Sequence, residues 1–140
     1  MYSHIKLRIL NSVFLICFLA SGFATADYID GEEANAKGDR DTAFSEFYNA
    51  AQQGDGLAYG KLGSMYLYGL GTKKDYQQAY VWFHMAYLNG EREGERFRDA
   101  ASSMMTREQY LIAVEAAETQ RITQQLGEAP PQSMPPTLAR

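Results

Sequence analysis

Few side chains in this 140-residue sequence have the types and spacing that catalysis requires. His84 is the only histidine after residue 26, and no serine, cysteine or acidic motif lies around it that would complete a catalytic triad or a metal site. The single cysteine, Cys17, lies in an N-terminal apolar run, so the rest of the chain has no thiol for a disulfide or a metal. The sequence therefore predicts no catalytic residue, no metal ligand and no cofactor.

Two other patterns have a chemical and a structural explanation, and the structural one is favoured in both. Carboxylates adjoin at Glu32 and Glu33 and gather again in segment 91–98, but arginines alternate with the second group, which is typical of a solvated helix face. The glycines of segment 69–71 precede two lysines without the full Gly-x-x-x-x-Gly-Lys-Ser/Thr pattern or a preceding strand. This segment is predicted to be a turn and not a phosphate-binding loop.

The two ends of the chain differ in composition from its middle. Lys6 and Arg8 precede a mostly apolar run that ends in Ala24-Thr25-Ala26, the small residues that a signal peptidase recognises. We expect residues 1–26 to be a cleaved signal peptide that makes the protein periplasmic or secreted, with an uncleaved membrane anchor as the alternative. All four prolines lie near the other end, where residues 127–140 are predicted to form a flexible tail. Residues 27–126 remain as the folded domain.

The charge balance argues against nucleic acid as a partner. Lys and Arg total 13 against 17 Asp and Glu, a formal net charge of -4, and cleavage after Ala26 removes two positive charges and no negative ones. A net negative domain has no electrostatic attraction for phosphate polymers. We also expect no membrane contact once the signal peptide has been removed.

A repeat with an offset of 36 residues organises the domain. The residues that recur are Asp39, Ala43, Phe44, Phe47, Ala50 and Gly54, which match Asp75, Ala79, Tyr80, Phe83, Ala86 and Gly90. Apolar residues at i, i+4 and i+7 in each copy form one face of a helix, and the alanines allow a neighbouring helix to approach closely. The sequence therefore predicts two equivalent helices, one in each copy.

Capping and turn residues divide the domain into three helix pairs. The first helix of each pair is predicted over about 28–37, 58–69 and 91–104. Gly38-Asp39 is predicted as the first turn, and Asp75 and Thr106 are predicted to cap the helices that follow them. Thr106 and Gln109 form a capping box, and Gly127 would end the last helix. Because each repeat can bury its apolar face only against its neighbours, the sequence predicts an all-α, right-handed α-solenoid of about three antiparallel helix pairs.

The quoted motifs resemble those of a known family. The residues concerned are Ala50-Ala51-Gln52-Gln53-Gly54-Asp55, Leu62-Gly63, Met65-Tyr66, Gly69-Leu70-Gly71, Asp75, Ala79, Trp82-Phe83, Ala86 and Gly90. Together they resemble one complete Sel-one-like (Sel1-like) repeat, a relative of the tetratricopeptide repeat with a longer Gly-x-Gly turn. The resemblance covers about residues 27–120. It implies a tetratricopeptide-like superhelix in which the first helices of the pairs line a concave surface.

One polar stripe is a candidate contact surface. Lys61, Ser64 and Tyr68 follow one another at i, i+3 and i+7 on the first helix of the second pair, beside its buried stripe. The resemblance places this stripe on the concave surface, so we expect a non-catalytic adaptor or scaffold that binds a segment of another protein there. Two alternatives remain: an envelope hydrolase or other enzyme, as proposed for some exported relatives that are rich in cysteine pairs, and a membrane-tethered scaffold with an uncleaved anchor.

Overall fold

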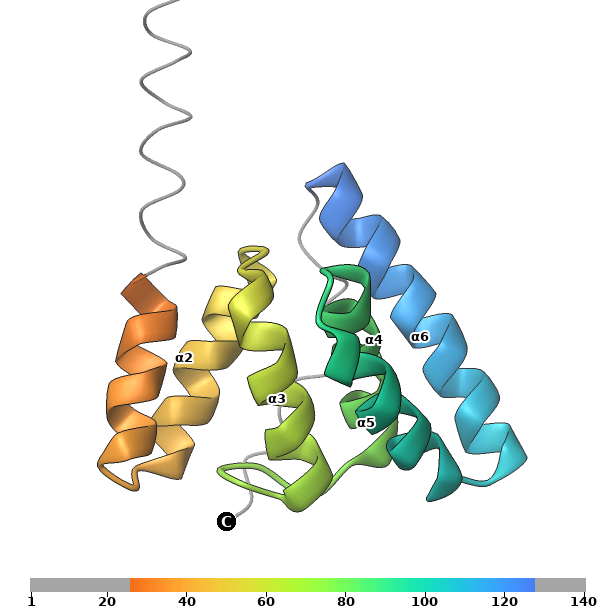
Figure 1. The fold of residues 1–140 in the computed structure, drawn as a ribbon, viewed down its shortest axis with the longest axis horizontal. Coiled ribbons are helices and arrows are strands. Elements are labelled where there is room, and N and C mark those ends of the chain that lie inside the picture. Colours follow the sequence, from red (N-terminus) through yellow and green to blue (C-terminus); the bar gives the residue numbers. More distant parts are fainter. Residues whose placement is uncertain (1–25, 128–140) are drawn as a thin grey trace, which may run out of the picture.

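The computed structural model describes residues 26–127, which form helices joined by short turns and contain no strand. Residues 26–36 are helical. The helices that follow are α2 (Arg40–Gln52), α3 (Gly56–Tyr68), α4 (Tyr76–Leu88), α5 (Arg92–Ser103) and α6 (Arg107–Leu126). They succeed one another from one end of the molecule to the other (Figure 1). The all-α repeat architecture predicted from the sequence is confirmed.

A side-chain N-cap starts the second helix of each pair, as predicted for Asp75 and Thr106. The carboxylate of Asp39 accepts a hydrogen bond from the backbone N–H of Thr42, and that of Asp75 accepts from two N–H groups at the start of α4. Thr106 and Gln109 form the predicted capping box at the start of α6. These side chains satisfy backbone donors that the first turn of a helix leaves unpaired. Gly127, with φ +66°, ends α6 in the left-handed conformation.

The buried side chains follow the same 36-residue repeat as the sequence. Phe47 of α2 and Phe83 of α4 are each 1% exposed. Each ring lies against a glycine of the preceding helix: a Cβ atom on Gly31 would stand 2.8 Å from the Phe47 ring, and one on Gly63 would stand 2.7 Å from the Phe83 ring. Glycine at these two positions therefore lets the two helices of a pair pack closely, with the aromatic ring filling the space.

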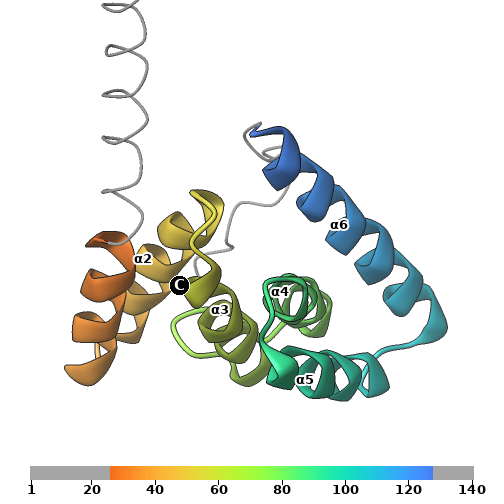
Figure 2. The ribbon, with the colours of Figure 1, turned by 45° about the horizontal axis from the view of Figure 1, so that its top comes forward.

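The last two helices depart from a regular pair. α4 packs against α3 and α5, and α6 also packs against α4 and makes little contact with α5 (Figure 2). α6 is longer than the other helices and leads away from α5 at the turn around Thr106 (Figure 2). No helix within 26–127 has the length and apolar character to cross a membrane. The predicted signal peptide, except Ala26, and the predicted tail from Glu128 onward lie outside the described residues.

Candidate functional site

The three residues of the predicted stripe lie on α3 in three different environments. The ammonium of Lys61 forms an ion pair with Glu32 of the first helix at 2.8 Å, and this bond raises the pKa of Lys61. The Ser64 hydroxyl donates to the backbone carbonyl of Gly60, one turn earlier. Tyr68 is 60% exposed at the end of the helix. Tyr68 is thus the member of the stripe with the largest exposed side chain, while the charge of Lys61 is balanced within the protein.

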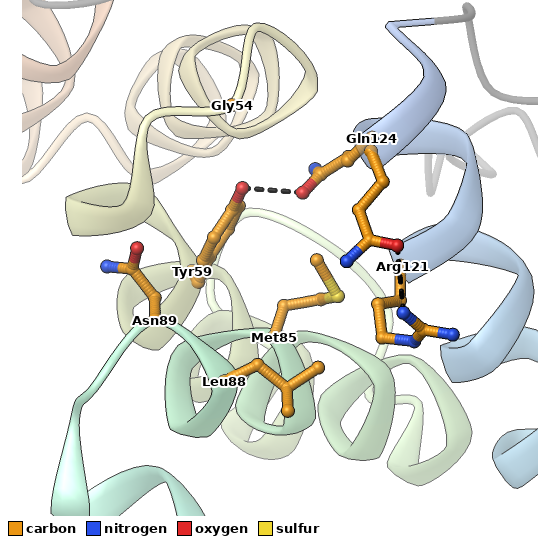
Figure 3. Close-up of a pocket in the computed structure, with 8 residues that line it drawn as sticks. Gly54, Tyr59, Met85, Leu88, Asn89, Arg121 and Gln124 are labelled. Atoms are coloured by element: carbon orange, nitrogen blue, oxygen red, sulfur yellow. Dashed lines mark hydrogen bonds between the residues drawn. The ribbon is translucent and has the colours of Figure 1, made fainter.

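A groove of about 480 Å³ lies elsewhere, between α3, α4 and α6 (Figure 3). Its volume is within the range of pockets that bind small molecules. Its lining residues are Gly54, Tyr59, Met85, Leu88, Asn89, Arg121, Gln124 and Gln125. None of the predicted stripe residues is among them. The groove has apolar side chains from α4, three side-chain amides and one cation, and no acidic residue lines it.

Hydrogen bonds join the two sides of the groove. The hydroxyl of Tyr59 on α3 donates to Oε1 of Gln124 on α6 at 2.6 Å (Figure 3). The Nε2 of the same glutamine donates to the backbone carbonyl of Ala51 at the end of α2. Burial raises the pKa of Tyr59, so its hydroxyl stays protonated and acts as the donor in this bond. Gln124 therefore connects α6 to two other helices and fixes the width of the groove at this end.

Arg121 supplies the positive charge of the groove. Its guanidinium forms an ion pair with Glu118 on the same helix, and its Nη1 donates to Oε1 of Gln125 at 2.9 Å. The bond to Glu118 raises the pKa of Arg121 and lowers that of the glutamate. These contacts hold the guanidinium along α6, where it forms one side of the groove (Figure 3).

The only histidine in the described part of the chain packs against an aromatic ring of its own helix. The ring of His84 stacks on that of Tyr80 with centroids 6.2 Å apart. Burial, together with the positive charge of Arg98, lowers the pKa of His84. Its Nδ1 atom is buried without a hydrogen-bond partner. Within residues 26–127 no group of three or more His, Cys, Asp or Glu side chains is placed to hold a metal ion.

Comparisons with known proteins identify relatives of the helical repeats. No family model matches the chain. An uncharacterized Sel1-like repeat-containing protein of Schizosaccharomyces pombe is 44% identical over 68 residues, which is 48% of this chain and 10% of that protein. The crystal structure of c5321, a protective antigen of uropathogenic Escherichia coli with a Sel1-like repeat fold, superposes with a TM-score of 0.62 and 29% identity. It covers 87% of this chain.

The described part of the chain has the Sel1-like repeat fold, and 68 residues of the chain are similar in sequence to a Sel1-like repeat protein. The chain spans a tenth of the yeast protein and 28% of the solved antigen, so its likeness to them concerns the repeats and not the whole of either molecule. The family resemblance that its glycines and aromatic residues carry is confirmed.

The residues of the groove were not predicted from the sequence. Arg121 and Gln124 lie outside the part of the chain that repeats, and Tyr59 was indistinguishable from other core aromatics. Leu88 and Asn89 follow Ala86, the last alanine that matches in the repeat, and their sequence predicts only the end of a helix. Only the path of α6 across α4 brings these residues together.

Proposed function

We propose that this protein is a non-catalytic scaffold that binds an extended segment of another protein in the groove between α3, α4 and α6. The observation that carries the proposal is the lining of the groove. It combines apolar contact area from Met85 and Leu88 with side-chain amides and lacks a nucleophile, an acid–base pair or a metal-binding cluster. Repeat proteins of this kind are in general adaptors, which supports the same conclusion.

The groove chemistry suits a peptide backbone. An extended segment exposes unpaired carbonyl and amide groups, which the side chains of Asn89 and Gln125 can pair with. Leu88 is 47% exposed at the groove, so it is available to an apolar side chain of the ligand. Since Arg121 is the one charged lining residue, a segment that carries an acidic or neutral side chain would fit better than a basic one.

The binding test compares substitutions inside and outside the groove. A phage-displayed peptide library is selected on the full chain, and the captured peptides are measured against variants. Leu88→Glu should abolish binding, whereas Leu57→Glu, an exposed leucine of α3 outside the groove, should not change it. The double variant Lys61→Ala, Tyr68→Ala tests the predicted stripe. Loss of binding in that variant together with normal binding by Leu88→Glu would move the site to the stripe.

We also propose that the protein is exported and acts in the periplasm or outside the cell. The apolar run before Ala26 supports export, as does the solved relative, which is a protective antigen. Mass spectrometry of the natural protein should give a mature chain that begins at Asp27. A mature chain that retains Cys17 would contradict cleavage and favour the membrane-tethered scaffold.

A further inference from the structure

The second helices of the three pairs share one register, set by their N-caps. Counted from Asp39, Asp75 and Thr106, the fifth and eighth positions are buried in the first two pairs, whereas at the twelfth Ala51 is buried and Tyr87 is 40% exposed. The fifth position holds Phe44, Tyr80 and Leu111, the eighth holds Phe47, Phe83 and Val114, and the twelfth holds Ala51, Tyr87 and Glu118. In α6 the same helix face continues for one more turn, to Ile122, four residues after Glu118.

Burial at these positions differs between α6 and the two helices before it. At the fifth position the exposed fraction is 4% for Phe44 and 7% for Tyr80, but 58% for Leu111. At the eighth it is 1% for Phe83 and 38% for Val114. The residues Leu111, Val114, Glu118 and Ile122 therefore form an exposed stripe, the outer stripe of α6. It has no neighbouring helix within residues 26–127, because α6 packs against α4 through Ala113 and Ala117 on its other side.

The α4–α5 contact shows what covers the equivalent positions of α4. The ring of Phe97 stacks on that of Phe83 with centroids 5.2 Å apart. Gly94, one turn earlier, lies so close to the α4 backbone that a Cβ atom would stand 2.8 Å from the carbonyl oxygen of Phe83. The guanidinium of Arg98 lies 5.4 Å from the ring centre of Tyr87. The covering helix thus presents a small residue, an aromatic three residues later and a cation directly after it.

We propose that the outer stripe of α6 docks one helix of a partner protein in the way that α4 docks α5. The contacts that α5 makes with α4, transferred to the equivalent positions of α6, predict which residues that helix carries. A small residue would approach the α6 backbone, a large apolar residue three positions later would cover Val114, and a basic residue after it would face Glu118. Tyr87 attracts Arg98 through its ring. At the equivalent position of α6, the Glu118 carboxylate pairs with Arg121 of its own helix but is 51% exposed, so it would accept a second cation from the docked helix. This surface is separate from the groove and does not depend on its function.

A second copy of the chain fits this stripe poorly. Within the described residues, the helix at the other end of the array is that of residues 26–36, which exposes Ile29 together with Asp30 and Glu33. Docked on α6, these carboxylates would approach Glu115 and Glu118, and like charges at a contact oppose association. The formal net charge of -4 on each chain adds to the repulsion. A helix of another protein that places one basic residue beside Glu118 is the occupant to which this surface is complementary.

The experiment uses a fluorescent, end-capped peptide with the sequence of residues 91–105, which carries the pattern of Gly94, Phe97 and Arg98. Fluorescence anisotropy measures its binding to the full chain. We expect saturable binding that Leu111→Glu weakens by about tenfold or more, because a charge would then be buried against the apolar stripe. Leu57→Glu, at an exposed position of α3 outside the groove and the outer stripe, is the control and should leave peptide binding unchanged. Circular dichroism checks that each variant is folded.

A charge exchange makes the test specific. Glu118→Lys in the protein and Arg98→Glu in the peptide should each weaken binding, and the two together should restore it, since the pair then attracts again. Absence of binding, or binding that is insensitive to both Leu111→Glu and Glu118→Lys, would overturn the proposal. The second result would mean that the peptide displaces α5 from α4. A stable dimer of the free chain that Leu111→Glu dissociates would also overturn it, in favour of a second copy.

Discussion

α4 and α6 are built on the same register but are held in the protein in different ways. α4 lies between α3 and α5 and buries large side chains, among them Tyr80, Trp82 and Phe83. α6 buries only Ala113, Ala117 and Thr123, and each of its large apolar side chains is at least 38% exposed. Two helices with similar capping and similar spacing therefore differ in burial because one has neighbours on both sides. The position of a helix in the array therefore determines how much its packing contributes to the stability of the protein.

The largest expected effect comes from shortening the side chains of Phe83 and Val114, which lie eight residues after the N-caps of α4 and α6. Phe83→Ala should lower the free energy of unfolding by about 3–5 kcal/mol, because it removes a buried ring that contacts Gly63 and Phe97. Val114→Ala, at the equivalent position of α6, should lower it by less than about 0.5 kcal/mol, the usual range at exposed sites. Urea unfolding followed by circular dichroism measures both. Equal costs would mean that α6 is covered in solution.

The next test concerns how closely α3 approaches α4. Gly63→Ala should destabilise the protein by about 1–3 kcal/mol, since the new Cβ atom would stand 2.7 Å from the Phe83 ring. Gly60→Ala is the control on the same helix, with the same gain in helix propensity. Its Cβ atom would meet the carboxylate of Glu91, the end of a flexible side chain. If both variants melted at the same temperature, the close packing of glycine against phenylalanine would not be a source of stability.

The fold could be predicted because its determinants are local or repeated. Asp75 and Thr106 cap helices through hydrogen bonds that depend on a few neighbouring residues, and both caps are seen. The offset of 36 residues identified the buried faces of α2 and α4 without any knowledge of their partners. These features required only a periodicity and a capping pattern, and the predicted helix bounds differ from the observed ones by one or two residues at most ends.

The groove could not be predicted because it depends on where a helix lies in space. The sequence placed a capping box at Thr106 and a last helix after it, but it contained no information on the side of α4 that this helix would cover. Gln124 contacts Tyr59 and Ala51, which are 65 and 73 residues away in the chain. A contact at such a separation leaves no periodic pattern. The stripe of Lys61 and Tyr68, in contrast, follows from spacing alone and stays a prediction.

A smaller effect should follow from the hydrogen bonds that hold the end of α6. Tyr59→Phe removes the donor to Gln124 and should cost about 0.5–1.5 kcal/mol, the net value of one such bond. Hydrogen exchange should then rise mainly in the last turns of α6 and little in α4, since α4 is held by packing on both sides. A uniform increase over all helices would mean that α6 unfolds only together with the core and that the two helices are equally held.

The smallest expected effect is the contribution of His84 to the pH dependence of stability. His84 lies on α4, near charged residues of α5 and α6. Burial and the positive charges of Arg98 and Arg121 lower the pKa of His84 in the folded protein, and Glu118 opposes them. The unfolded chain has a histidine pKa of about 6.5, so on acidification it takes up a proton before the folded state does. The free energy of unfolding should therefore fall as the pH is lowered through about 6.5, and this fall should end below the folded pKa.

His84→Gln isolates this contribution, because glutamine is polar but does not titrate between pH 7.5 and 5. The loss of stability between these two pH values should be smaller in the variant than in the wild type, although carboxylates such as Glu91, whose pKa burial raises, act in the opposite direction in both. Peptide capture by the groove should not change. A variant with the same pH dependence as the wild type would show that His84 is as solvated as in the unfolded chain. Loss of a measurable turnover in the variant would instead favour the enzyme alternative over the scaffold.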